Sequence, residues 1–246
     1  MTTVRTGWFE DCAVGERRDL GGYPVTENDL ASPFGLAADL LRAVVAVDGW
    51  LGGSWTQVRP PRPGEPLRAE LTTIRRRRSA GGDTGVVTWH LALRDAGGAV
   101  CQEGTASGRL AARGAGPDPV GRDVGTVAWG RALAERLGRR PAFAEALASW
   151  DGAVGLRAGE DEVQLRIYRG RVLEAVARTP RGATFTLGAD ELTWVRLLTA
   201  EDNEFMRTAM TGGFTVRGAG YEYLRLTSVL HLVIDVAREL ALEEAP

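Results

Sequence analysis

Two residues of the N-terminal half carry side chains suited to acid–base chemistry, Asp39 and His90. Asp39 lies in "GLAADLL", near the start of an expected helix, where the positive end of the helix dipole favours a carboxylate that acts as a base or orients a substrate. A charge that only caps the first turn is the simpler alternative. His90 lies in "VVTWHLALRD", and its unperturbed pKa of about 6.5 suits a general base at neutral pH. A purely structural strand histidine is the alternative there.

Aromatic and methionine side chains gather in two regions that could bind a hydrophobic ligand. Small-molecule sites are mostly apolar with few polar groups, so these side chains are candidates for lining a pocket. Side chains of this kind also form ordinary cores, and both interpretations stay open. The candidate substrate-binding residues are Trp50, Trp55, Trp194, Phe205, Met206, Met210 and Phe214.

The residue types that are missing exclude several chemistries. All 30 basic residues are arginine, so no lysine is present to form a Schiff base or to serve a P-loop. His90 and His231 are the only histidines, which argues against a His-rich zinc site, and His231 is interpreted as structural. Cys12 and Cys101 lack metal-ligand spacing and are expected to be reduced, partly buried thiols. No G-x-G-x-x-G motif joins a strand to a helix, so neither a cofactor nor a metal is expected.

The charge distribution argues against a nucleic-acid partner. The net charge is −2, whereas binding through bulk electrostatics needs a basic surface. The run "RRRR" at 75–78 could attract the phosphates of coenzyme A or an acidic carrier protein, although a solvated strand end is the simpler interpretation.

The chain length predicts two domains. At 246 residues the chain exceeds the usual size of one domain, and the Gly- and Pro-rich stretch 114–125 interrupts the hydrophobic periodicity near its middle. We expect domains over 1–113 and 126–246, joined by the linker 114–125. No apolar run approaches the ~18 to 20 residues that span a bilayer, and the N-terminus lacks the pattern of a secretory signal, so a cytoplasmic protein without membrane insertion is expected.

The apolar patterns predict an α+β fold in both halves. In the first half, a buried helix beginning near Pro33 is followed by three strands that alternate apolar and polar residues, which favours an antiparallel sheet against the helix. In the second half, a helix over 127–150 precedes three strands, two short helices, a strand and a long C-terminal helix. Asp190 is placed to cap the first short helix.

The first half resembles the MaoC-like hotdog family over about residues 7–113. The resemblance is carried by "GWFEDCAVGERRDLGGYPVTENDL", "PFGLAADLL" and "VRPPRPGEPLRAELTTIRRRRS", in which Glu65 stands where the family usually has Asp. It implies a hotdog domain, an antiparallel sheet around a central helix, and a thioester substrate near Asp39. The family's G-D-x-N-P-x-H loop is missing here, so its catalytic Asp and His correspond to no residue of this chain.

The second half resembles a sterol carrier protein type two domain over about residues 143–242. The matching segments are "ATFTLGADELTWVRLLTA", "FMRTAMTGGFTVRGAG" and the apolar C-terminal helix. The resemblance implies an α/β domain with a tunnel for fatty acyl or sterol-like ligands.

Together these features lead to three functional hypotheses. The first is a biosynthetic enzyme that acts on a hydrophobic acyl-thioester or polyketide-derived substrate by dehydration, cyclisation or isomerisation, with Asp39 as the best single acid or base and His90 as a second candidate. The second is a non-catalytic carrier of a hydrophobic or acyl ligand. The third is a partner subunit that completes another hotdog's site. One hotdog copy is encoded, so a homodimer is expected, with a hydrophobic small molecule or a carrier-protein or coenzyme A thioester as ligand.

Overall fold

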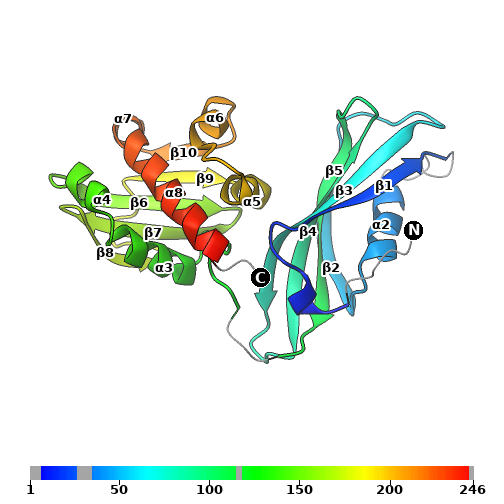
Figure 1. Cartoon of the computed structure of the whole chain (residues 1–246), viewed down its shortest axis with the longest axis horizontal. Helices are drawn as coiled ribbons and strands as arrows, with labels where there is room; N and C mark the ends of the chain where they lie inside the picture. The colour runs from blue at the N-terminus through cyan, green and yellow to red at the C-terminus, as the bar shows by residue number, and fades with distance from the viewer. Residues whose placement is uncertain (1–6, 27–34, 115–117, 244–246) are drawn as a thin grey trace. The chain divides into compact units, whose positions relative to one another are not determined.

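The computed structural model describes residues 7–26, 35–114 and 118–243. The chain divides into two compact units, Met1–Asp118 and Pro119–Pro246. Part of the expected linker packs on the second unit, because Arg122 Nε donates a hydrogen bond to the carbonyl of Ala241. Each unit has its own sheet, its own helices and its own core, so the fold is α+β as predicted (Figure 1).

The first unit is an antiparallel five-stranded sheet with one long helix against its inner face. The strand order is β1-β3-β4-β5-β2, which leaves β1 and β2 at the two edges. This helix-on-sheet arrangement is the one that the hotdog resemblance implies (Figure 1). The elements are η1 (Phe9–Asp11), β1 (Arg17–Pro24), α2 (Gly35–Val44), β2 (Gly49–Gln57), β3 (Pro66–Arg78), β4 (Thr84–Arg94) and β5 (Val100–Ala111).

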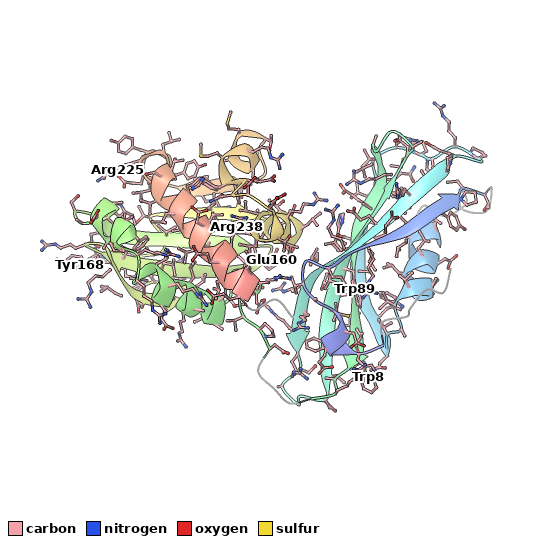
Figure 2. The ribbon with its side chains drawn as sticks, in the orientation of Figure 1. Trp8, Trp89, Glu160, Tyr168, Arg225 and Arg238 are labelled. Carbon is pink, nitrogen blue, oxygen red and sulfur yellow. The ribbon has the colours of Figure 1, made fainter. Side chains whose placement is uncertain are left out.

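Alternation along the strands defines the two faces of this sheet. The odd-numbered β4 residues from Val87 to Leu93, including Trp89 (Figure 2), belong to one buried cluster with Leu36, Leu41 and Val44 of α2. They form the inner face, and the even-numbered β4 residues point away from the helix because side chains alternate along a strand. The core of the first unit therefore lies between α2 and the inner face.

The second unit is a mixed sheet with its helices on one face. The strand order is β10-β9-β6-β7-β8, and only the β6–β9 pair is parallel. Figure 1 shows the long C-terminal helix crossing this sheet. The elements are α3 (Val127–Leu137), α4 (Pro141–Ala146), β6 (Asp151–Ala158), β7 (Asp161–Tyr168), β8 (Arg171–Val176), β9 (Phe185–Ala189), α5 (Glu191–Thr199), α6 (Phe205–Met210), β10 (Thr215–Gly218), α7 (Gly220–Arg225) and α8 (Thr227–Glu243).

Two helices predicted as continuous are broken in the structure. The segment 127–150 forms α3 and α4, which are separated around Gly138 and restart at Pro141, a residue whose fixed φ suits the first turn of a new helix. The C-terminal segment likewise divides into α7 and α8 at Leu226. The capping role predicted for Asp190 is confirmed, since its side chain accepts a 2.6 Å hydrogen bond from the backbone N–H of Thr193.

Among the described residues, no helix is both long and apolar enough to cross a membrane.

Candidate functional site

A pocket of about 410 Å³ lies in the first unit where helix α2 meets the edge strand β2. This volume falls within the range of about 300 to 1,000 Å³ that is typical of small-molecule sites. The lining is mostly apolar and comes from α2, β2 and β5. Trp50 and Trp55, both predicted as substrate-binding residues, line it together.

Register explains how the two tryptophans reach one face of β2. Trp50 pairs with Gly108 on β5, and Trp55 pairs with Gly104. A one-residue irregularity after Trp50 shifts the alternation, so that two residues five positions apart both point to the inner face. Because both partners on β5 are glycines, the indole rings have room over the neighbouring strand.

On the other side of the pocket, the described lining residues of helix α2 are three apolar side chains and one cation. Ala37, Ala38 and Leu41 line it, followed by Arg42. Arg42 Nη1 donates a 3.0 Å hydrogen bond to Asp39 Oδ1. Asp39 itself is not among the lining residues, and 74% of its side chain is exposed. Asp39, the predicted acid or base, therefore does not line the pocket itself but is hydrogen-bonded to Arg42, which does.

Two hydroxyl groups belong to lining residues but lie on the other face of the sheet. Ser54 and Thr105 line the pocket, yet Ser54 pairs with Thr105 and Thr105 pairs with His90, so alternation directs both side chains away from α2. Their hydroxyl oxygens lie 3.0 Å apart on that face. Among the lining residues that the structure describes, Arg42 is therefore the charged group that can bind a carbonyl or another anionic oxygen, and no ordinary general base is present.

His90 lies on the opposite face of the sheet from this pocket. It pairs with Thr72 and Thr105 across the strands, and alternation directs its side chain away from α2. Its Nε2 lies 3.4 Å from Glu103 Oε2. The structure therefore does not bring the two predicted acid–base residues, Asp39 and His90, to one pocket.

The predicted binding residues of the second half divide between core and surface. Trp194, Phe205 and Phe214 form a packed aromatic cluster, with ring centroids 5.6 Å apart for both the Trp194–Phe214 and the Phe205–Phe214 pairs. Met206 and Met210 lie on α6 with 43% and 83% of their surface exposed. None of the five lines the apolar pocket of the first unit or the polar pocket of about 650 Å³ beside Arg166 and Thr184 in the second.

The arginine run at 75–78 divides between the two faces of β3. Arg76 and Arg78 lie over the ring of Phe9, at 5.5 and 4.9 Å from its centroid. Arg78 also pairs with Glu10 at 3.1 Å and with Asp118 at 3.0 Å. These two arginines bind η1 to the end of the β3–β4 hairpin and therefore have structural contacts. The other two, Arg75 and Arg77, pair with Thr88 and Val86 on β4.

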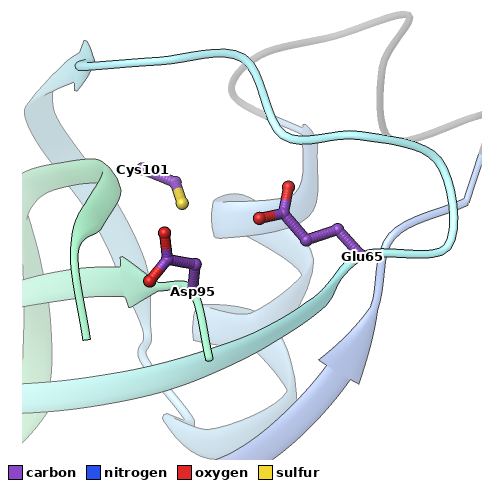
Figure 3. A group of neighbouring side chains, drawn as sticks. All are labelled: Glu65, Asp95 and Cys101. Atoms are coloured by element: carbon purple, nitrogen blue, oxygen red, sulfur yellow. The ribbon is translucent and has the colours of Figure 1, made fainter. Parts of the chain in front are cut away.

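Glu65, Asp95 and Cys101 form a cluster whose potential ligand atoms lie within 4.8 Å of one another (Figure 3). Arg59 occupies the carboxylates, since its Nη2 donates to Glu65 Oε1 at 2.5 Å and to Asp95 Oδ2 at 2.7 Å. Hydrogen bonding from Arg59 and from the backbone N–H of Arg62 lowers the pKa of Glu65 to about 2. Burial raises the pKa of the Cys101 thiol, which disfavours the thiolate that binds metals. The cluster acts as a clamp that ties the Pro-rich corner after β2 to the β4–β5 turn.

Sequence reasoning missed the edge strand and the cation that lines the pocket. Strand β2 has the sequence "GWLGGSWTQ", whose glycines hide its alternation. Arg42 reaches the pocket only through the placement of α2, which a single sequence does not specify. The Trp-x-x-x-x-Trp spacing around a glycine pair was the one signal for this site in the sequence.

Comparisons with known proteins agree with the resemblances of both halves. No protein-family model and no curated protein matches the chain. A crystal structure of sterol carrier protein 2 is 24% identical, with a TM-score of 0.40, and the match covers 46% of this chain and 96% of that one. The MaoC-like dehydratase from Rhodospirillum rubrum is 24% identical, with a TM-score of 0.37 and coverages of 44% and 98%.

A third solved structure, the R-hydratase PhaJ1 from Pseudomonas aeruginosa, is 16% identical, with a TM-score of 0.29 and coverages of 45% and 93%. Each of these matches spans less than half of the present chain. The solved structures to which this chain is similar therefore include both kinds of protein that its sequence resembles, a MaoC-like hotdog protein and a sterol carrier protein.

Proposed function

We propose that the protein binds a hydrophobic acyl-thioester or polyketide-derived molecule in the pocket between α2 and β2. The observation that carries this proposal is the pocket itself, which has two indole side chains, an apolar helix face and, among the described lining residues, one cation, Arg42. An apolar chain or ring gains free energy by leaving water for such a surface. Arg42 supplies hydrogen-bond donors for the polar end of the molecule.

In the enzymatic form of this proposal, the reaction is a dehydration, cyclisation or isomerisation. Arg42 stabilises negative charge that develops on a carbonyl oxygen, and Asp39, held 3.0 Å from Arg42, exchanges the proton. Confining the substrate between the indoles and α2 supplies the positioning on which such reactions depend. His90 is assigned no part in this step because it lies on the other face of the sheet.

The pocket's composition also supports a non-catalytic form, a carrier of the same ligand. The described lining residues include no histidine, carboxylate, cysteine or tyrosine. A pocket of this kind binds and shields an acyl group without transforming it. Replacing Asp39 distinguishes the two forms, because Asp39→Asn abolishes turnover if Asp39 exchanges the proton and leaves ligand binding intact in both.

The edge strand β2 supports a homodimer as the functional form. It has nine residues and no charged side chain, and Leu51 and Ser54 are exposed on it. Such an edge offers unpaired backbone groups to another strand, and a second copy supplies an identical edge. Pairing there would place the second copy beside the pocket. The same position would suit a different hotdog chain, as in the hypothesis of a partner that completes the site. A cytoplasmic location suits the two buried, unpaired thiols of Cys12 and Cys101.

Calorimetric titration with decanoyl coenzyme A tests the proposed binding. Ala38→Trp fills the pocket from α2, so it should weaken binding by at least tenfold. Ala43→Trp is the matched control, since Ala43 lies exposed on the same helix and does not line the pocket. Equal affinity of the Ala38→Trp variant and the wild type would refute the site. No binding of any acyl or polycyclic probe to the wild type would refute the function.

A further inference from the structure

The inner face of β2 carries two indole side chains, and the residue between them on this face has no side chain. Between Trp50 and Trp55, the residue that the register places on this face is Gly53, which pairs with Ala106 on β5. Gly53 brings the strands so close that a Cβ there would lie 2.4 Å from the Thr105 carbonyl oxygen. The result is a slot bounded by indoles at both ends, and Ala37 and Ala38 of α2 also line this pocket.

We propose that this slot holds a planar aromatic or polycyclic ring system, rather than an extended alkyl chain. The inference rests on the proposed binding function and names the class of its ligand. It depends on how Trp50 and Trp55 are packed, on their spacing along β2, and on the small residues that line the space between them.

Each indole is held in place by packing of its own. Trp55 lies over Gly104, where an added Cβ would come 2.2 Å from Trp55 Cε3. Trp50 packs edge-to-face on the buried Trp89, with ring centroids 6.1 Å apart and planes at 66°. Trp50 nevertheless keeps 39% of its surface exposed. Both rings therefore present surface to a ligand with little freedom to move.

The gap matches an inserted ring. With a strand rise of about 3.4 Å per residue and one residue taken up by the irregularity, the Cα atoms of Trp50 and Trp55 lie roughly 14 Å apart along β2. Aromatic rings prefer centroid separations of about 4.5 to 7 Å, so two such contacts in series span roughly 9 to 14 Å. The Cα spacing therefore leaves room for a planar system between the indoles, and the proposal places it in contact with both.

The shape of the pocket disfavours a long chain. The residues that separate the indoles, Gly53 and Ala106, and the facing Ala37 and Ala38 are all small, so they leave room for a broad group between the two rings. A flexible chain must fold up to fill such a space and loses rotational freedom at each bond. A rigid ring loses none of that freedom. Arg42 is placed to pair with an acidic or carbonyl substituent on the ring.

Two acids of equal carbon number test the inference by calorimetry, 2-naphthoic acid as the planar probe and undecanoic acid as the chain. We expect the wild type to bind 2-naphthoic acid at least tenfold more tightly. Trp50→Leu keeps apolar bulk but removes the flat face, so it should weaken naphthoate binding about tenfold and change undecanoate binding less than threefold. Trp8→Leu is the matched control, because Trp8 is equally exposed, at 41%, and lies outside the pocket.

The outcomes separate the inference from the function on which it rests. Tighter binding of undecanoic acid, or an equal loss for both probes in Trp50→Leu, would overturn the ring assignment while leaving the hydrophobic site in place. Loss of naphthoate binding in Trp8→Leu as large as in Trp50→Leu would also overturn it. Failure of both probes and of decanoyl coenzyme A to bind the wild type would overturn the proposed function as well.

Discussion

The indole ring of Trp55 lies directly over Gly104, and a Cβ at position 104 would come within 2.2 Å of both Trp55 Cε3 and the Ser54 carbonyl oxygen. This contact joins the edge strand β2 to β5 and fixes one wall of the pocket at the same time. The packing of the sheet and the shape of the binding site therefore depend on the same glycine.

Replacing this glycine should damage both stability and binding. Gly104→Ala forces the backbone or the indole to shift, and overpacking of this kind costs about 1 to 3 kcal/mol. Urea denaturation gives the change in the free energy of unfolding. Gly22→Ala on β1 is the control, since an added Cβ there meets nothing within 4 Å. Similar stability of the two variants would contradict the packing described for Trp55.

Both cysteines should be unreactive in the folded protein. Cys12 and Cys101 are buried, and burial raises the pKa of the Cys12 thiol to about 12 and also raises that of Cys101. Because the thiolate is the reactive form, neither should react with Ellman's reagent near neutral pH until the protein unfolds. Titration with and without denaturant measures this. Rapid reaction of either thiol in the native protein would show that it is accessible.

The stability of the first unit should fall under acidic conditions. The pKa of Glu65 is lowered from 4.5 to about 2 by hydrogen bonds from Arg59 and Arg62. For Glu10, burial raises the pKa, but hydrogen bonds from the backbone of Arg113 and from Arg78 outweigh it and lower the value to about 2. The stabilisation is present above pH 4.5 and is lost as the pH falls from 4.5 towards 2.

Urea midpoints at about pH 5 and about pH 3 measure this loss. Glu65→Gln should lower the midpoint at the higher pH and reduce the difference between the two. Glu160→Gln is the comparison, because Glu160 in the second unit makes no ion pair with the part of the chain that the structure describes (Figure 2). An unchanged pH dependence in Glu65→Gln would show that the clamp does not contribute.

The proposed homodimer depends on the uncharged edge of β2. Leu51→Lys places a charge where 53% of the side chain is exposed, and two copies would then meet with like charges along one edge. Light scattering after size-exclusion chromatography should show a dimer for the wild type and a monomer for this variant. Leu173→Lys, on the exposed surface of β8 in the second unit, should leave the dimer intact. A monomeric wild type would contradict the proposal.

The helix α2, the strands β3 to β5 and the strands β7 to β10 followed from hydrophobic periodicity, whereas β1, β2 and β6 were missed. Periodicity failed where glycine replaced the informative side chains, as in β2, and where Pro141 restarted a helix inside an otherwise continuous apolar pattern. The sequence also places Asp39 near the helix start without revealing its partner, because the pairing with Arg42 depends on rotamers that no spacing rule specifies.

The candidate site was predictable only in part, because residue types can be read from a sequence but the register of neighbouring strands cannot. Trp50 and Trp55 stood out by residue type, and the pocket brings them together. His90 also stood out by residue type, but the face of a strand residue depends on the register of its neighbours, and this register directs His90 away from α2. The aromatic residues of the second half could not be assigned to core or pocket without the packing that surrounds Trp194.

Hydrogen–deuterium exchange with and without decanoyl coenzyme A tests the central claim most directly, because it locates the bound ligand without assuming a site. The account predicts slower exchange in peptides that cover α2 (Gly35–Val44) and β2 (Gly49–Gln57), with the peptides of the second unit unchanged. Protection confined to the second unit, for example around α5 and α6, would contradict it and place the ligand in the sterol-carrier-like half.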